Sequence, residues 1–488
     1  MSQLTAVHLV SLGCARNDVD SEELAARLED GGFRLVDEPA DADAVMVNTC
    51  GFIEAAKMDS ISTLQEAADL NADGKDRAIV AVGCMAERYG AELAEALPEA
   101  DAVLGFDDYG TIAERLTSIL AGNKHTSHVP RDRRKLLPIS PSARPAAAAK
   151  VSLPGHASRL DVEAAAPDLP ATLAPASGPR ATRRRLGSGP SSPVKIASGC
   201  DRRCTGCALP RFRGAYVSRP AEQIVEETRW LADHGVREAF LVSENTSSYG
   251  KDLGDIRALE KLLGSLSEIE KLDWIRVSYL QPAETRPELI AAMASVPKVV
   301  PYFDLSFQHA SATVLRRMRR FGDPDSFLDL INRIRDLAPH AGLRTNVIAG
   351  FPGETEADVA VLRDFLIAAE LDVVGVFGYS DEEDTAAEKL DGHIDADEIE
   401  ARRSDLTDLV GELMDQRASE RIGESVSVLI EEMTDEGLLG RSVHQGPEVD
   451  GTTLLVNDGE SPWAAGVGDI VAATVTGSDG VDLIAEPR

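Results

Sequence analysis

Three short hydrophobic runs near the amino terminus share one design, at residues 6–13, 44–49 and 78–83. Each is rich in Val, Ile or Leu, is followed by a cysteine, and then by a stretch with helical periodicity. The expected helices cover residues 18–30, 54–68 and 87–97. Short apolar runs that alternate with helices are typical of parallel strands buried in one sheet. We therefore expect an α/β domain with an open parallel sheet over residues 1–121.

A second α/β pattern covers residues 194–420. Six apolar runs alternate with helical patterns, at residues 195–198, 239–243, 274–279, 302–307, 344–349 and 373–379. Repeated units of this length favour a partial parallel (β/α) barrel. A helix over 395–421 would close this domain.

Two further segments have different patterns. Residues 122–193 are crowded with Ala, Pro, Ser and Gly, and carry the basic runs RDRRK and RRR, which is typical of a linker. Residues 421–488 contain short alternating strands with turn signals between some of them, which predicts a small antiparallel β-barrel. The strands are expected at 426–430, 454–456, 470–475 and 483–485.

Composition narrows the class of protein. The 488 residues are 43% hydrophobic and 27% charged, as in globular proteins. The sequence shows no apolar run of membrane-spanning length and no signal-peptide pattern, so we expect a cytoplasmic protein without a membrane partner. The net charge of −32 disfavours polyanions on average and favours a positively charged partner, unless it serves solubility alone.

The strongest chemical signal is a group of three cysteines directly after a predicted strand. Cys200, Cys204 and Cys207 have C-x3-C-x2-C spacing. Three thiolates on one loop can bind three irons of a [4Fe–4S] cluster and leave the fourth iron open. Zinc sites usually have four ligands, and no fourth cysteine or histidine lies close by in the sequence. The pattern therefore favours a cluster over zinc or structural thiols.

The remaining cysteines, Cys14, Cys50 and Cys84, occupy the same position in three successive strand units. Because the carboxyl ends of parallel strands meet at one edge of a sheet, these thiols should converge there. Buried thiols are common in cores, which is the alternative. The repetition favours a second three-cysteine cluster site.

The spacing around Cys200 resembles the signature of radical S-adenosylmethionine enzymes. This resemblance implies that the open iron chelates S-adenosylmethionine, whose reductive cleavage gives methionine and a 5′-deoxyadenosyl radical. It also implies cofactor contacts at Ser243, Glu244, Gln308 and Gly350, although turn chemistry or capping would explain the same residues. Gly206 departs from the family, which usually has an aromatic residue there, and this departure implies looser packing around adenine.

The chain resembles the methylthiotransferase family over nearly its whole length. SLGCARNDVDSE, VNTCGF, VGCMAERY and CDRRCTGCALPRFRGAYVSRP are similar to its characteristic blocks. The resemblance implies two [4Fe–4S] clusters, with an auxiliary cluster on Cys14, Cys50 and Cys84, a radical barrel, and a carboxyl-terminal TRAM barrel that grips substrate. One S-adenosylmethionine would methylate a sulfur at the auxiliary cluster, and a second would supply the radical.

Later blocks such as FLVSENTSSYGKDLGD and NVIAGFPGETE resemble the branch that modifies the β-carbon of an aspartate in the twelfth small-subunit ribosomal protein. Residues 421–488 contain 13 acidic and 3 basic residues, which suits a basic protein better than RNA. The basic run RRMRR at 316–320 is a solvated face, a set of pairs with local carboxylates, or a contact with ribosomal RNA. Transfer RNA methylthiolation and a non-radical sulfur carrier remain alternatives. A flavodoxin or ferredoxin is the expected electron donor, the sulfur donor is open, and the ribosomal protein would be modified free or on the ribosome.

Overall fold

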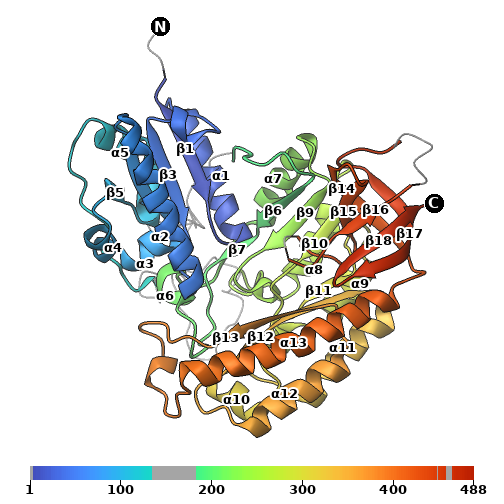
Figure 1. Ribbon diagram of the computed structural model, residues 1–488. Coiled ribbons are helices and arrows are strands. Elements are labelled where there is room, and N and C mark those ends of the chain that lie inside the picture. Colours follow the sequence, from blue (N-terminus) through green and yellow to red (C-terminus); the bar gives the residue numbers. More distant parts are fainter. Residues whose placement is uncertain (1–3, 134–182, 448, 458–463) are drawn as a thin grey trace, which may run out of the picture.

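The computed structural model describes residues 4–133, 183–447, 449–457 and 464–488. Three units follow one another along the chain (Figure 1). The amino-terminal domain (blue) and the small carboxyl-terminal barrel (red) lie on opposite sides of the central domain. Most of the expected linker, residues 134–182, lies outside the described residues. Among the described residues, no helix has the length and apolar character needed to cross a membrane.

The amino-terminal domain is a parallel sheet in the order β2-β1-β3-β4-β5. Its strands are β1 (Ala6–Ser11), β2 (Arg34–Leu35), β3 (Ala44–Thr49), β4 (Ala78–Val82) and β5 (Ala102–Val103). Its main helices are α1 (Ala15–Asp30), α2 (Glu54–Asp69) and α5 (Ile112–Leu120). The expected helix at 87–97 is wrong as a single element, because α3 (Gly83–Tyr89) and α4 (Ala91–Ala96) are separated at Gly90. Gly90 has φ +45°, and a Cβ there would lie 2.1 Å from the carbonyl oxygen of His128.

The central domain is a partial barrel of two three-stranded parallel sheets, in the orders β10-β9-β6 and β11-β12-β13. Parallel bridges from Leu280 to Leu305 and from Ile275 to Val299 join the sheets. The strands are β6 (Ser191–Lys195), β9 (Glu238–Val242), β10 (Trp274–Val277), β11 (Tyr302–Asp304), β12 (Gly342–Ala349) and β13 (Val373–Gly378). The larger helices are α7 (Ala221–Asp233), α8 (Ala258–Ser267), α9 (Pro287–Ser295), α11 (Pro324–Leu337), α12 (Glu356–Ala369) and α13 (Ala396–Glu420).

The first barrel strand differs from the prediction of 195–198. The strand is β6, Ser191–Lys195, and it begins inside the range assigned to the linker. Pro193 hid it from the hydrophobic pattern, but β6 lies at the edge of its sheet, where a proline is tolerated. Ala197–Ser198 forms the short strand β7, which pairs antiparallel with β8 (Val217–Ser218).

The carboxyl-terminal unit is a closed barrel in the order β14-β15-β16-β18-β17. Its strands are β14 (Ser425–Met433), β15 (Leu438–Ser442), β16 (Thr453–Leu455), β17 (Ile470–Asp479) and β18 (Asp482–Pro487). The sequence pattern missed β15. The barrel is antiparallel except for β16 and β18, which pair parallel.

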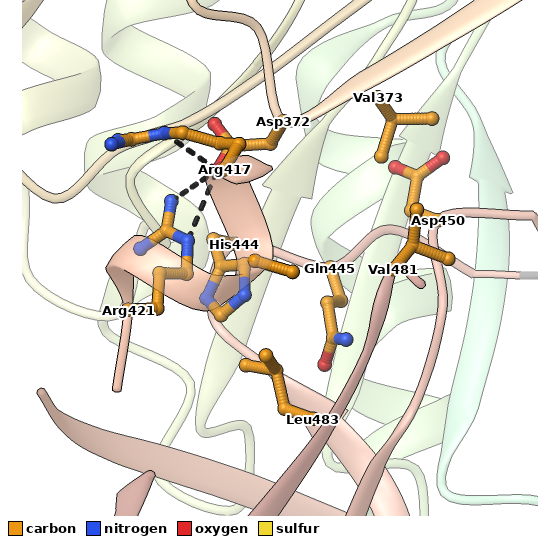
Figure 2. A pocket seen from close by; sticks show the side chains of 10 residues that line it. Asp372, Val373, Arg417, Arg421, His444, Gln445, Asp450, Val481 and Leu483 are labelled. Atoms are coloured by element: carbon orange, nitrogen blue, oxygen red, sulfur yellow. Dashed lines mark hydrogen bonds and ion pairs between the residues drawn. The ribbon is translucent and has the colours of Figure 1, made fainter. Parts of the chain in front are cut away.

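A small pocket lies where this barrel meets the central domain (Figure 2). Asp372, which precedes β13, binds Arg421 at the end of α13, and His444 lies beside them. The start of β12 is equally close, because a Cβ on Gly342 would lie 2.3 Å from the carbonyl oxygen of His444. This seam therefore covers the amino ends of the strands of the central domain, opposite the end where (β/α)-barrel enzymes place their active sites.

Candidate active site between two cysteine clusters

The side chain of Asn17 ties the three amino-terminal cysteine loops together. Its Nδ2 donates to the carbonyl oxygens of Leu12 (2.9 Å) and Thr49 (3.1 Å), just before Cys14 and Cys50. Its Oδ1 accepts from the Sγ of Cys84 at 3.4 Å. A Cβ on Gly13 would lie 3.0 Å from the Sγ of Cys50. The structure thus brings the three loops to one edge of the sheet, as the strand repetition predicted.

The charge around these thiols comes from two arginines, one from each domain. Burial raises the pKa of Cys84 to about 12, against the lowering effect of Arg213. Burial also acts to raise the pKa of Cys14, but Arg16 and Arg213 outweigh it and the net shift is downward. For Cys50 burial dominates and the pKa is raised. The site therefore places two buried cysteines and one partly exposed cysteine next to two guanidiniums.

The second cysteine group lies on the loop after β7, at the carboxyl end of the first barrel strand. Two backbone bonds shape this loop: the Cys200 amide donates to Gly214 O, and the Cys207 amide donates to Cys204 O. Thr205 anchors the tip of the loop to helix α10 (Ala312–Arg317), which lies far along the chain, because its hydroxyl donates to Arg317 O at 2.7 Å. All three cysteine residues are partly exposed, although burial raises the pKa of the Cys207 thiol to about 12 and that of Cys200 to about 11.

Part of the basic run at 316–320 belongs to this site. Arg320 directs Nη1 to the Sγ of Cys204 at 3.5 Å, and Nη2 to Gln281 Oε1 at 2.7 Å. Arg317 donates to Pro352 O at 2.7 Å. Two members of the run therefore hold the cysteine loop and its neighbours, whereas Arg316 and Arg319 are exposed.

Gly206, which departs from the usual aromatic residue, faces a pair of aromatic rings. A Cβ at this position would lie 3.5 Å from the ring of Phe351 and 3.7 Å from that of Tyr379. These two rings pack edge to face with centroids 5.1 Å apart. Two aromatic side chains, from the ends of β12 and β13, therefore lie beside Gly206, the position at which the family usually has an aromatic residue of its own. The Tyr379 hydroxyl donates to Asp381 at 2.6 Å.

Ser243 and Glu244 follow β9 and lie beside Arg16 of the amino-terminal domain. Arg16 donates to Ser243 O at 3.1 Å, and its Nε lies 3.9 Å from Glu244 Oε1. Both carboxylate oxygens of Glu244 are buried and make no hydrogen bond to the described residues. Apart from the ion pair with Arg16, this buried carboxylate therefore has two acceptor oxygens to which a hydrogen-bond donor could bind.

Gln308 and Gly350 follow strands β11 and β12, and the contacts of both are structural. Gln308 has φ +70°. Its amide donates to Asn346 O, and its carbonyl oxygen accepts from the Ile348 amide, both in β12. Gly350 has φ +81°, and a Cβ there would lie 2.5 Å from Cγ1 of Ile399. Its amide donates to Glu354 Oε1 at 2.9 Å.

Glu354 is the centre of a buried network next to these residues. Its carboxylate also accepts from Arg402 at 2.9 Å and lies 3.2 Å from Nε2 of His309. Since Nδ1 of His309 accepts from the Ser311 amide, the ring proton belongs on Nε2, which donates to Glu354. His309 and Glu354 therefore stabilise the loop around Gly350.

The cysteine sets fit clusters better than single ions. Among the described residues, no three His, Cys, Asp or Glu side chains are close enough to hold one metal ion. A cubane cluster binds each cysteine through a different iron, so its ligands stand farther apart than those of one ion. All six cysteines are free thiols.

Comparison with known proteins agrees with this geometry. Residues 6–105 match the uncharacterized protein family UPF0004, residues 194–366 the radical SAM superfamily, and residues 422–487 the TRAM domain. Over 99% of its length, the chain is 66% identical to a ribosomal protein uS12 methylthiotransferase RimO from Cutibacterium acnes, covering 98% of that protein. A RimO from Kineococcus radiotolerans is 60% identical, with 99% of this chain and 97% of that protein covered.

The chain belongs to the RimO methylthiotransferase family. Membership makes it a radical S-adenosylmethionine enzyme with a TRAM domain, and implies a [4Fe–4S] cluster and S-adenosylmethionine. It is also consistent with a second cluster. Among solved structures, a radical S-adenosylmethionine methyltransferase, TsrM, from Kitasatospora setae has a TM-score of 0.51 at 16% identity, over 76% of this chain and 72% of that one. That likeness supports the fold alone.

Sequence reasoning did not single out Arg16, Asn17, Arg213 or Arg320 as members of the methylthiotransferase site. Arg16 and Asn17 lie within three residues of Cys14, and Arg213 lies six residues after Cys207. Their proximity in sequence was a usable signal. Their contacts across the domain boundary could not be deduced from spacing.

Proposed function

We propose that this chain adds a methylthio group to the β-carbon of an aspartate in ribosomal protein uS12. The observation that carries the proposal is that the two cysteine-bearing domains contact each other at these sites: Arg213 donates to the Cys84 sulfur at 3.0 Å, and Arg16 donates to Ser243 O at 3.1 Å. The full-length RimO relatives, which are named as uS12 methylthiotransferases, support the choice of substrate.

In this proposal Cys200, Cys204 and Cys207 hold one [4Fe–4S] cluster, and the amino-terminal cysteines hold the other. When bound, the clusters and S-adenosylmethionine supply the electron, the radical and the methylated sulfur. The protein orients these groups. Glu244 would accept hydrogen bonds from the ammonium group of the cofactor, and Ser243 and Gly350 would shape the backbone around it.

The charge of the carboxyl-terminal barrel supports a basic protein partner. Of the three basic residues in 421–488, Arg421 and Arg441 are buried in ion pairs with Asp372 and Glu238. Arg488 is the one basic side chain that remains exposed there. A surface with so little positive charge is poorly suited to neutralise RNA phosphates, whereas acidic groups attract a basic ribosomal protein.

Mass spectrometry of uS12 tests the substrate. Deletion of the gene should remove the mass of one methylthio group from uS12, and the wild-type chain should restore it. Loss of a methylthio group from transfer RNA, with unchanged uS12, would instead support the transfer RNA alternative.

The role of the acidic barrel has its own test. The double change Glu432→Lys and Asp435→Lys should slow association with uS12 at low salt. Glu92→Lys with Glu95→Lys, on exposed α4, is the matched control of equal charge. Equal slowing by both pairs would contradict a specific role for the barrel.

Radical chemistry is separated from a sulfur-carrier role by product analysis. Cys200→Ala should abolish formation of 5′-deoxyadenosine by the reduced protein, whereas Cys84→Ala should preserve it but abolish methylthio transfer. If the unsubstituted, reconstituted chain forms no 5′-deoxyadenosine, the radical proposal fails. We further propose a cytoplasmic enzyme that receives electrons from a flavodoxin or ferredoxin and acts on uS12 free or on the ribosome.

A further inference from the structure

Helix α6 (Leu209–Arg213) connects the two cysteine sites directly. It begins two residues after Cys207 and ends at Arg213. From there the guanidinium leaves the central domain and enters the amino-terminal domain. Nη2 donates to the Sγ of Cys84 at 3.0 Å and to Asn17 Oδ1 at 2.7 Å, and Nη1 donates to Asp20 Oδ2 at 2.8 Å.

The carboxylate partner of Arg213, Asp20, has a second cationic partner. Asp20 also binds the buried ammonium group of Lys195, so these two residues form a neutral pair without Arg213. All three side chains are buried. Arg213 and Lys195 thus share one carboxylate, and the guanidinium of Arg213 also donates to the sulfur of Cys84.

A second arginine crosses the domain boundary in the opposite direction, from the amino-terminal domain to the central domain. Arg16 of the amino-terminal domain reaches Ser243 and Glu244 at the end of β9. Each domain thus places one arginine in the cysteine or cofactor region of the other. An arginine that only stabilised the interface would not need to end on a thiol.

We propose that Arg213 of the central domain completes the auxiliary cluster site of the amino-terminal domain, by donating a hydrogen bond to the Cys84 sulfur and so raising the reduction potential of the cluster bound there. The inference rests on the proposed function, because it requires the auxiliary cluster. A positive charge and a hydrogen bond at a ligand sulfur favour the reduced, more negative form of a cluster. Arg213 is a positioning residue, since it acts through Cys84 and Asn17.

The test is a redox titration of the auxiliary cluster, followed by electron paramagnetic resonance, in the full-length chain. The changes Cys200→Ala, Cys204→Ala and Cys207→Ala leave the auxiliary cluster as the reporter. In this background Arg213→Gln should shift the potential to a more negative value, and Arg213→Lys should shift it less, because it keeps the charge but loses the planar fork. Arg211→Gln, on the same helix but paired with Asp384 at the surface, should leave the potential unchanged.

The potentials and the iron contents of the variants separate a redox role of Arg213 from a structural one. Equal potentials for Arg213→Gln and Arg211→Gln, with full iron content, would show that Arg213 is only structural. Loss of the cluster from Arg213→Gln, but from neither Arg213→Lys nor Arg211→Gln, would support its role in completing the site. Loss from all three variants would overturn it. A different result would be that the chain with the three cysteine changes, and with Arg213 intact, binds no cluster. In that case the auxiliary cluster site of the proposed function itself fails.

Discussion

The guanidinium of Arg16 lies over the ring of Tyr279, with Cζ 4.9 Å from the ring centroid. Tyr279 follows β10 and has φ +61°, a conformation that is strained for an aromatic residue. The Tyr279 amide donates a hydrogen bond to the Asp304 carboxylate at 2.9 Å, which holds the residue in this conformation. Strained residues of this kind cluster at functional sites. A cation from one domain therefore covers a strained strand end of the other, next to Glu244.

Replacing Glu244 with Gln should weaken the binding of S-adenosylmethionine by roughly tenfold or more, the size expected for loss of a charge-assisted hydrogen bond. The physical reason is that both Glu244 oxygens are buried and lack a hydrogen-bond donor among the described residues. Anaerobic calorimetry on the cluster-loaded protein measures the affinity. Glu270→Gln, at an exposed position of the same domain, is the control. Unchanged affinity with full cluster content would remove Glu244 from the cofactor site.

Gly350→Ala should destabilise the chain by about 1–3 kcal/mol and weaken cofactor binding. The added methyl would meet Ile399 of α13 at 2.5 Å, in addition to the cost of the positive φ. Gly254→Ala is the matched control, because Gly254 has φ +78° but nothing within 4 Å of its Cβ position. Thermal unfolding of both variants separates the steric effect from the backbone effect. Equal losses in the two variants would show that the contact with Ile399 is unimportant.

Gly206→Ala should be tolerated and should raise stability by about 0.4–1 kcal/mol, because it restricts the unfolded chain. The new methyl would make ordinary van der Waals contacts with Phe351 and Tyr379. Thermal unfolding and cofactor affinity are the measurements. A marked loss of affinity would mean that the glycine, rather than the neighbouring rings, is what the adenine side of the site requires.

Much of this architecture could be predicted from local pattern, because each strand that leads to a cysteine in the amino-terminal domain is a short apolar run. The same pattern failed at β6, whose Pro193 is acceptable only because the strand lies at a sheet edge, a fact of tertiary structure. It also failed at Gly90, where the close approach of His128 separates two helices.

The site divides in the same way. Cys200, Cys204 and Cys207 were visible from spacing, and Cys14, Cys50 and Cys84 from repetition along the sequence. Arg213 and Arg320 were not, because their roles depend on contacts to residues more than a hundred positions away. The basic run around Arg320 looked like a solvated face, and only its geometry shows that one member faces a cysteine.

The seam between the central domain and the carboxyl-terminal barrel should loosen in acid. Glu238 is buried between Arg276 and Arg441, the latter from the barrel. Burial acts to raise the pKa of Glu238, but the two guanidiniums outweigh it and lower the pKa from 4.5 to about 2. A carboxyl whose pKa is lower in the folded chain contributes stability above its unfolded value. That contribution is lost as the pH falls from about 4.5 to about 2.

Glu238→Gln should therefore lower stability near neutral pH by about 3–5 kcal/mol, because it leaves the buried Arg276 without its counter-charge and Arg441 with Glu431 alone. The measurement is the melting temperature of the wild-type chain and the variant across a pH series. The difference between them should shrink as the pH falls from about 4.5 to about 2, because the carboxyl is protonated first in the unfolded chain and only near pH 2 in the folded one. Glu432→Gln, at an exposed position on β14, should differ little from the wild type at every pH. A gap for Glu238→Gln that stays constant down to pH 2 would mean that the ion pairs are not the source of the stability.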